Sequence, residues 1–179
     1  GFKMVTLTAS NEHGSNTKSN EFSFLVGGTP NDITSSYFEG FENSSSLFPW
    51  NVINYGDNIT SWQRTTSAGH NSNACAMLNS GERNLADLID PANGEDFDVL
   101  YSPSFDLSGT NETALNFSWA YSTTASDVAE VTEELLVFIS TNCGEDWSLL
   151  PGGQMTGATL INNGNNPQLP PPAWSERTL

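Results

Sequence analysis

Short strand-like segments that alternate with frequent turn residues are the feature that most constrains the fold of this chain. Runs of apolar and β-branched residues recur along the sequence, and each is followed by a connection rich in Gly, Asn, Asp, Ser or Pro. The segment 130–136 offers at most one helical turn, because β-branched residues lie beside its glutamates. The pattern therefore predicts an all-β protein in which antiparallel strands form a two-sheet β-sandwich or jelly roll.

The strands of this sandwich are expected from residue 36 onward. They are short and separated by polar connections, as is usual in sandwiches and jelly rolls. The stretch 151–172 carries Gly, Asn and Pro clusters in place of a strand pattern and is predicted to be a long loop. The expected strands are 36–42, 50–54, 61–65, 74–79, 97–102, 113–121, 134–140, 146–150 and 174–179.

The first part of the chain is predicted to be a separate unit. Residues 2–9 alternate between two faces, residues 11–16 have turn composition, and residues 21–26 form a second strand-like run, which predicts a β-hairpin. A lone hairpin is marginally stable in water, so residues 1–28 are expected to end a domain whose other strands come earlier. Residues 29–35 then form a linker. A start in mid-strand, without a signal peptide, further predicts a piece of a longer secreted protein.

The charge of the chain argues against several classes of partner. The sequence has 21 Asp and Glu residues against 5 Lys and Arg, which gives a formal net charge of −16. Such a surface repels phosphate backbones and anionic lipid headgroups, so we expect no nucleic-acid partner. No apolar run is long enough for a membrane span. The same acidity attracts cations, including calcium.

The sequence lacks the residue patterns of common hydrolases. A zinc protease needs a His-Glu-x-x-His helix, whereas the only histidines are His13 and His70, on separate units. No Gly-x-Ser-x-Gly nucleophile motif occurs either. His70 lies near Cys75 in the sequence, but a structural disulfide explains this cysteine better than a nucleophile does. We therefore predict no catalytic residues and expect that this fragment is not an enzyme.

The two cysteines and the tryptophans supply further candidates. Cys75 and Cys143 are predicted to pair in an oxidising compartment, a bridge that would stabilise the fold by about 4 kcal/mol; two unrelated thiols are the alternative. Aromatic rings stack on sugar rings, and Trp50 and Trp62 lie where a strand begins, so both are candidate ligand contacts. Trp119 lies in an apolar strand and is expected in the core. Packing inside the sandwich is the alternative for the other tryptophans as well.

The first hairpin carries a family resemblance. Residues 5–15 read V-T-L-T-A-S-N-E-H-G-S, which resembles the closing hairpin of a polycystic-kidney-disease (PKD) domain, an Ig-like module. Such domains commonly end in a V-T-L-T strand, an N-x-x-G-S turn and a last strand. The resemblance implies that residues 1–28 are the C-terminal hairpin of a PKD-like domain. The family's earlier acidic Gly-Asp-Gly region is not present in the sequence.

The second unit, 36–179, carries a longer series of motifs. They are F-E-G-F-E-N at 38–43, F-P-W at 48–50, N-S-N-A-C-A at 71–76, D-V-L-Y-S-P-S-F-D-L-S at 98–108, A-L-N-F-S-W-A-Y at 114–121, I-S-T-N-C-G-E-D-W at 139–147 and W-S-E-R-T-L at 174–179. In this order they resemble the cleaved-adhesin and MAM-like jelly-roll modules of secreted Bacteroidetes metalloproteases and adhesins. Because that family continues past the last motif, the resemblance implies that a terminal strand is missing after Leu179, which would leave a sheet edge exposed.

The resemblance also implies a metal site. In the related modules, glutamates of the opening segment look like metal ligands, which gives Glu39 and Glu42 as calcium ligands here, with Asp98 as the candidate third ligand. Calcium takes six to eight oxygen ligands, and carboxylates are among the oxygens it prefers. The alternative is that these are surface acids of a very acidic protein.

The function implied by the resemblance is that of an accessory module. It would be secreted or exposed at the cell surface, would recognise an extracellular protein or glycan, and would belong to a larger protein, a multidomain metallopeptidase. The alternative is a structural spacer or assembly module that contacts other copies or other segments of the parent protein. A stand-alone hydrolase ranks last.

Overall fold

The computed structural model describes residues 2–25, 30–33, 36–42, 45–54, 61–79, 97–164 and 168–179. Their regular structure consists of strands and two 3₁₀ turns, η2 (Val128–Glu130) and η3 (Gly157–Thr159). All strand pairs but one are antiparallel. The predicted all-β, antiparallel class is therefore confirmed, while the jelly-roll order of the strands stays a prediction. Among these residues, no helix has the length and apolar character needed to cross a bilayer.

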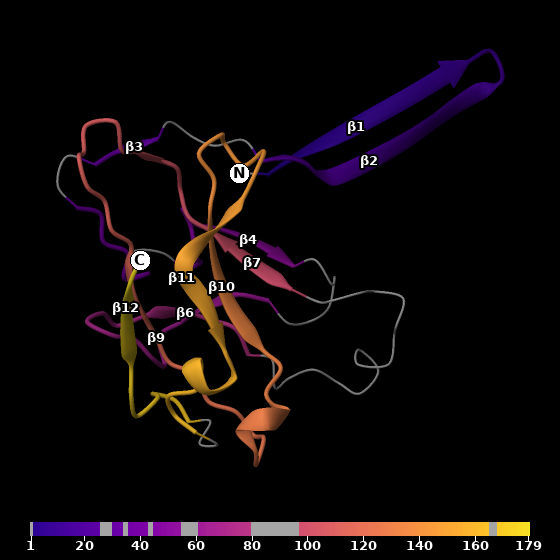
Figure 1. Cartoon of the computed structure of the whole chain (residues 1–179). Coiled ribbons are helices and arrows are strands. Elements are labelled where there is room, and N and C mark those ends of the chain that lie inside the picture. The colour runs from indigo at the N-terminus through magenta and orange to yellow at the C-terminus, as the bar shows by residue number, and fades with distance from the viewer. Residues whose placement is uncertain are drawn as a thin grey trace.

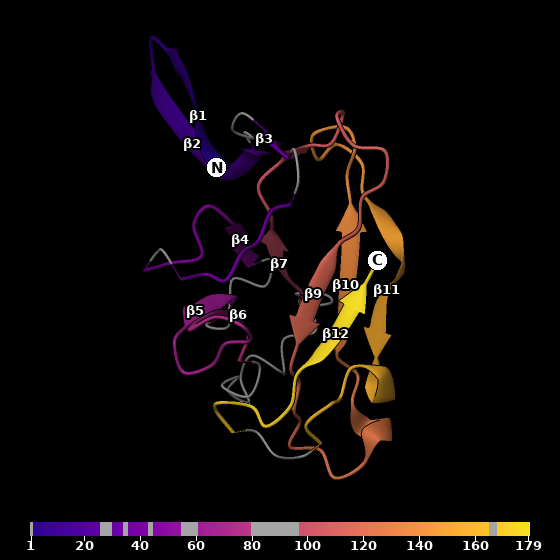
Figure 2. The same cartoon turned by 90° about the vertical axis from the view of Figure 1, so that its left-hand side faces the viewer.

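The N-terminal hairpin is formed by β1 (Phe2–Asn11) and β2 (Gly14–Leu25). It extends away from the rest of the chain (Figures 1 and 2). The strands are longer than expected, because β2 begins at Gly14 and includes the polar residues 15–20. Polar side chains suit this position, since residues 8–18 are exposed to solvent while the backbone ladder is paired. The hairpin is confirmed, whereas its origin in a PKD-like domain stays a prediction.

The predicted linker, 29–35, lies only partly among the described residues. Within it, β3 (Asn31–Asp32) pairs in parallel with β8 (Phe105–Asp106). The backbone N–H of Asn31 also donates to the carbonyl of Ser104 at 2.9 Å. This part of the linker is therefore attached to the second unit by backbone hydrogen bonds and is not a free tether.

The second unit is built from four antiparallel pairs. In Figure 2, β4–β7 and β5–β6 lie on one side, and β9–β12 and β10–β11 lie on the other. Each of these strands overlaps one of the segments expected from the sequence. The pairs join β4 (Asn51–Asn54) to β7 (Asp98–Tyr101), β5 (Gln63–Thr65) to β6 (Cys75–Met77), β9 (Asn116–Trp119) to β12 (Ser175–Thr178), and β10 (Glu134–Ile139) to β11 (Ser148–Thr156).

Two strand predictions need correction. Residues 36–42 form no strand, because the Glu39 carboxylate accepts the Phe41 N–H at 2.6 Å and closes a local turn in which Phe41 has φ 56°. In contrast, β11 continues into the predicted loop 151–172 as far as Thr156. Its register shifts between Leu136 and Phe138 of β10: Phe138 faces Leu149 before the shift, and pairing resumes where Gln154 faces Leu136.

Glycine makes this bulge in β11 possible. Gly152 has φ 78°, a backbone conformation that glycine adopts readily but that is strained for a residue with a side chain. A Cβ on Gly153 would lie 2.8 Å from the carbonyl oxygen of Val137. The two glycines, which looked like loop residues in the sequence, therefore allow β10 and β11 to stay paired across an irregular step.

Buried and partly buried residues hold β9, β11 and β12 of the second unit together. Met155 is fully buried on β11, and the Trp119 indole N–H donates to the carbonyl of Leu160 at 3.0 Å. The Arg177 guanidinium lies 5.9 Å from the centre of the Trp119 ring and donates to the Gly152 carbonyl at 2.7 Å. Trp119 packs against these neighbours but is only partly buried, so it is not fully in the core as the sequence predicts. The buried apolar residues are Leu47, Ile53, Ala68, Ala74, Val131, Met155 and Leu160.

Candidate functional site

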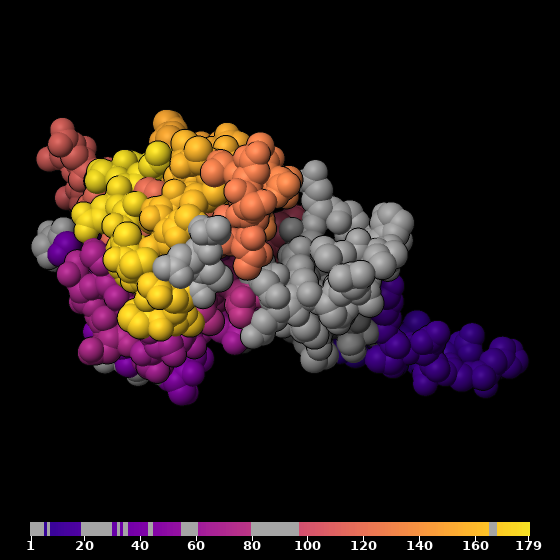
Figure 3. All heavy atoms as spheres, turned by 90° about the horizontal axis from the view of Figure 1, so that it is seen from below, coloured from indigo at the N-terminus to yellow at the C-terminus, as the bar shows by residue number. Residues whose placement is uncertain are grey.

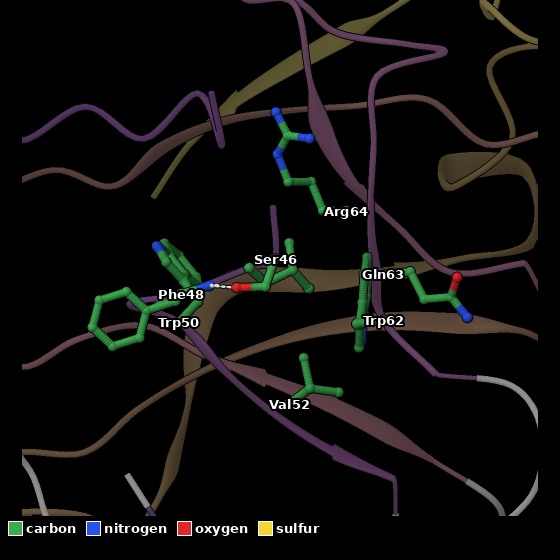
Figure 4. Close-up of a pocket in the computed structure, with 8 residues that line it drawn as sticks. Ser46, Phe48, Trp50, Val52, Trp62, Gln63 and Arg64 are labelled. Carbon is green, nitrogen blue, oxygen red and sulfur yellow. Dashed lines mark hydrogen bonds between the residues drawn. The ribbon is translucent and has the colours of Figure 1, made fainter. Parts of the chain in front are cut away.

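Trp50 and Trp62, the two candidate ligand contacts, line the same surface hollow. Its volume is about 300 Å³. Trp50 ends the turn before β4, and Trp62 directly precedes β5. Figure 4 shows the two indole rings on opposite sides of the space. The remaining lining residues are Ser46, Leu47, Phe48, Val52, Gln63 and Arg64.

The turn 46–50 sets the position of Trp50. Its ends are held by two hydrogen bonds, from Trp50 N–H to the Leu47 carbonyl at 2.8 Å and from Phe48 N–H to the Ser46 hydroxyl at 3.3 Å. Leu47 is buried beneath the turn, whereas Phe48 is 77% exposed. Phe41 contacts the Trp50 ring edge to face, with centroids 5.6 Å apart. Trp50 is therefore fixed by its neighbours, and Phe48 is free to contact a ligand at the rim.

Trp62 is fixed by a hydrogen bond to a neighbouring strand. Its indole N–H donates to the backbone carbonyl of Asp98, on β7, at 3.2 Å. The ring remains part-buried and faces the hollow from the side opposite Trp50 (Figure 4). A fixed aromatic ring loses little conformational entropy when a ligand stacks on it.

Arg64 connects the hollow to the loop 36–42. Its Nε–H donates to the carbonyl of Phe41, and its Nη2 donates to the carbonyl of Glu42 at 3.3 Å. The Glu42 carboxylate in turn accepts the Asn73 N–H at 3.0 Å. The guanidinium is therefore engaged with backbone carbonyls, and its main effect is to hold the loop that carries Phe41 behind Trp50.

The three predicted calcium ligands do not form a cluster. Both Glu39 oxygens accept protein donors, the Tyr37 hydroxyl at 3.0 Å and the Phe41 N–H at 2.6 Å. Both Glu42 oxygens accept from Asn73. Asp98 lies on β7, opposite Asn54. Over the described ranges, no three Asp, Glu, His or Cys residues are arranged to hold a metal ion. The glutamates brace the loop, and calcium binding stays a prediction.

The predicted disulfide is not formed. Cys75 and Cys143 are both free thiols. Cys75 lies on β6, where burial raises the pKa of its thiol. Cys143 is exposed at φ 62° in the turn between β10 and β11. In Figure 2 these elements lie at the lower left and the upper right, so the fold separates the two sulfurs. Spacing in the sequence gave no information on this separation.

The histidines also take ordinary positions. His13 is exposed at the hairpin turn beside Glu12. His70 Nε2 lies 3.1 Å from Glu176 Oε1, and its ring lies 5.5 Å from that of Trp174. The two histidines belong to different units, as the sequence indicated, and neither lines the hollow.

The sequence indicates the two tryptophans as candidates but gives no clear signal for the rest of the hollow. Phe48 stands out only as part of the F-P-W motif, and Gln63 and Arg64 carry no signal of their own. Their only sequence clue is that each lies within two residues of Trp50 or Trp62. Comparison of the chain with protein-family models, with curated proteins and with solved structures gives no match. The geometry of the hollow is therefore the main guide to function.

Proposed function

We propose that this chain is a non-catalytic recognition module of a larger secreted or cell-surface protein, and that it binds a neutral glycan in the Trp50–Trp62 hollow. One observation carries the proposal: two fixed indole rings from separate turns face one space. The apolar face of a sugar ring stacks on such rings, as apolar ligand surfaces do on aromatic side chains. A volume of about 300 Å³ is at the lower end of the range for ligand sites.

The polar residues of the hollow suit the hydroxyl groups of a sugar. Ser46 and Gln63 offer a hydroxyl and an amide, each of which both donates and accepts hydrogen bonds. The Arg64 guanidinium is already engaged with the carbonyls of Phe41 and Glu42. Since the chain carries a net charge of −16, it repels sulfated or uronic-acid glycans over a distance of about 8 Å at physiological salt. A neutral glycan fits both the lining and the charge.

The remainder of the proposal rests on the sequence. The motifs for zinc hydrolysis and for a serine nucleophile are missing, which supports a role in recognition over catalysis. The cleaved-adhesin-like motifs support a secreted parent, proposed to be a multidomain metallopeptidase whose substrate this module holds.

The experiment is a screen of the 179-residue chain against an array of neutral and acidic glycans, followed by titration calorimetry with the strongest ligand. We expect a neutral glycan to bind. Trp62→Ala and Phe48→Ala are expected to lower its affinity at least tenfold, because each removes a ring from the hollow. Trp147→Ala is the matched control, since Trp147 is 43% exposed outside the hollow. Equal binding by all variants, or binding of acidic glycans alone, would contradict the proposal.

A further inference from the structure

The β10–β11 hairpin has two apolar faces, although only one of them is buried. On the inner face, Met155 is 0% exposed and its partner Leu135 is half-buried. On the opposite face, Leu136 is 39%, Phe138 47% and Leu149 42% exposed. Phe138 and Leu149 face each other directly in the register, so they lie on the same side of the sheet. We call Leu136, Phe138 and Leu149 the outer apolar face.

This outer apolar face lies on the surface of the molecule. The hairpin is at the front in Figure 1, at the right-hand margin in Figure 2 and along the upper margin in Figure 3. In these views no other described element lies outside it. An antiparallel sheet with one buried face normally presents polar residues on the other. A contiguous set of large apolar side chains on an acidic protein therefore marks a contact surface.

The charges around the face indicate what it contacts. Glu134 is exposed two residues before Leu136, on the same side of β10. At the other end, Glu145 and Asp146 are exposed in the turn that leads to β11. The sequence contains no Lys or Arg between Arg83 and Arg177. Arg177 itself is engaged with the Gly152 carbonyl and the Trp119 ring. The face is thus apolar in the middle and acidic at both ends.

We propose that the outer apolar face docks an amphipathic helix of a partner protein that carries Lys or Arg on both sides of its apolar stripe. Charge complementarity favours this partner over a second copy of the chain, which would bring two sets of acidic residues, each from a chain of net charge −16, into contact. An amphipathic helix can cover such a face, because its apolar stripe packs on the side chains that the sheet presents. The six residues of β10 span about 20 Å, which a helix of about 14 residues matches.

The test uses three synthetic helical peptides of about 14 residues as probes. The first has a Leu stripe with Lys at both ends, the second has the same stripe with Glu at both ends, and the third keeps Lys but replaces Leu by Ser. Binding to the 179-residue chain is followed by fluorescence anisotropy at physiological salt. We expect the first peptide to bind at least tenfold more tightly than the other two, because it alone matches both the apolar centre and the acidic ends.

Variants of the chain separate docking from general attraction to an acidic protein. Phe138→Ser and Leu149→Ser leave the charge unchanged, lie on different strands, and are each expected to lower affinity at least tenfold. Phe48→Ser is the matched control, because Phe48 is exposed in the glycan hollow and not on this face. Circular dichroism checks that each variant is folded. Equal binding of the first peptide by Phe138→Ser and the original chain would overturn the proposal.

A second copy of the chain is the other possible occupant of the face, and it is tested by self-association. Sedimentation of the original chain is expected to show a monomer at the concentrations used for peptide binding. A dimer that Phe138→Ser dissociates would overturn the proposal in favour of a second copy. Glycan binding by Phe138→Ser is expected to be unchanged, so failure of this inference and failure of the proposed function give different results.

Discussion

The Trp50–Trp62 hollow and the β10–β11 hairpin are held together by different interactions. The hollow is built from turns, and its shape depends on side chains that bond to backbone groups, such as Arg64 to Phe41 and Trp62 to Asp98. The hairpin depends on a backbone ladder and on apolar burial around Met155. The difference teaches that the shape of the hollow depends on side-chain hydrogen bonds, whereas the hairpin depends on backbone pairing and apolar burial. Substitutions in the core of the hairpin are therefore expected to lower the free energy of unfolding, whereas substitutions that disturb the hollow are expected to lower ligand affinity as well.

The largest effect on stability is expected at the centre of the hairpin's inner face. Met155→Ala removes a fully buried side chain and leaves a cavity, so we expect the free energy of unfolding to fall by about 2 to 5 kcal/mol. Urea unfolding followed by tryptophan fluorescence measures it. Leu136→Ala, on the exposed face of the same hairpin, is the matched control and is expected to cost much less. Equal losses in both variants would show that the two faces are not distinct.

The next effect is expected at Arg64, which supports the hollow. Arg64→Ala removes the hydrogen bonds to the carbonyls of Phe41 and Glu42, and we expect a loss of about 1.5 to 3 kcal/mol in the free energy of unfolding. Glycan affinity is expected to fall as well, because Phe41 no longer holds Trp50 from behind.

Arg64→Lys separates charge from geometry at this position. A lysine keeps the charge but lacks the planar fork that reaches two carbonyls, so it is expected to restore only part of the affinity. Full restoration by lysine would contradict the positioning role. Binding of the Lys-flanked peptide to the outer apolar face is expected to be unchanged in both Arg64 variants. Unchanged peptide binding would show that the effect of Arg64 is limited to the hollow.

The sequence predicted those features that depend on local pattern. Alternation and turn residues located the paired strands, and the placement of Trp50 and Trp62 at strand starts found two walls of the hollow. It failed where distant residues decide the structure. β11 runs through Pro151, Gly152 and Gly153 because β10 offers a partner on the far side of the bulge. The outer apolar face was missed because strand alternation does not reveal which apolar face is covered.

The predicted disulfide and calcium site show the same limit. Cys75 and Cys143 were paired because both occur in a chain with secreted features, but strand pairing places them on different parts of the fold. Glu39 and Glu42 resemble family ligands in the sequence, yet the structure gives all four carboxylate oxygens protein donors. A motif identifies residue types, whereas the partners of each residue depend on the folded chain.

A smaller effect is expected from tyrosine ionisation at high pH. Burial, with a contribution from the nearby Glu133 carboxylate, raises the pKa of Tyr121 to about 12 from an ordinary 10.0. The folded state therefore favours the protonated hydroxyl, and its contribution to stability is complete below pH 10 and is lost as the pH rises toward 12. Tyr121→Phe is expected to flatten this part of the curve of unfolding free energy against pH.

Tyr37, in the loop beside the hollow, is the tyrosine with which the pH effect of Tyr121 can be compared. Burial and the hydrogen bond to Glu39 also raise the pKa of Tyr37, but its side chain is in the loop beside the hollow and is 38% exposed. Tyr37→Phe is therefore expected to flatten the alkaline part of the curve less than Tyr121→Phe does. A larger flattening by Tyr37→Phe than by Tyr121→Phe would indicate that the loop beside the hollow is more tightly packed than the region around β9.

The smallest effect is expected at Glu42, where the structure and the family resemblance lead to different outcomes. If the carboxylate only braces the loop through Asn73, Glu42→Gln weakens one exposed contact, and we expect a loss of about 0.5 to 1.5 kcal/mol. That loss is then the same in calcium and in EGTA. If Glu42 is a calcium ligand, EGTA lowers the Tm of the original chain, because a ligand that binds only the folded state stabilises it.

Thermal melts of the original chain, Glu42→Gln and Glu112→Gln, each in calcium and in EGTA, distinguish the two roles. Glu112 is the control, because it is an exposed glutamate in the connection between β8 and β9. We expect bracing, because each Glu42 oxygen already has a donor on Asn73, and a metal would have to replace both hydrogen bonds. An EGTA-induced fall in Tm that occurs in the original chain and in Glu112→Gln, but is absent from Glu42→Gln, would instead establish the calcium site. It would also mean that the loop behind Trp50 is held by a metal ion, and glycan affinity would then depend on calcium.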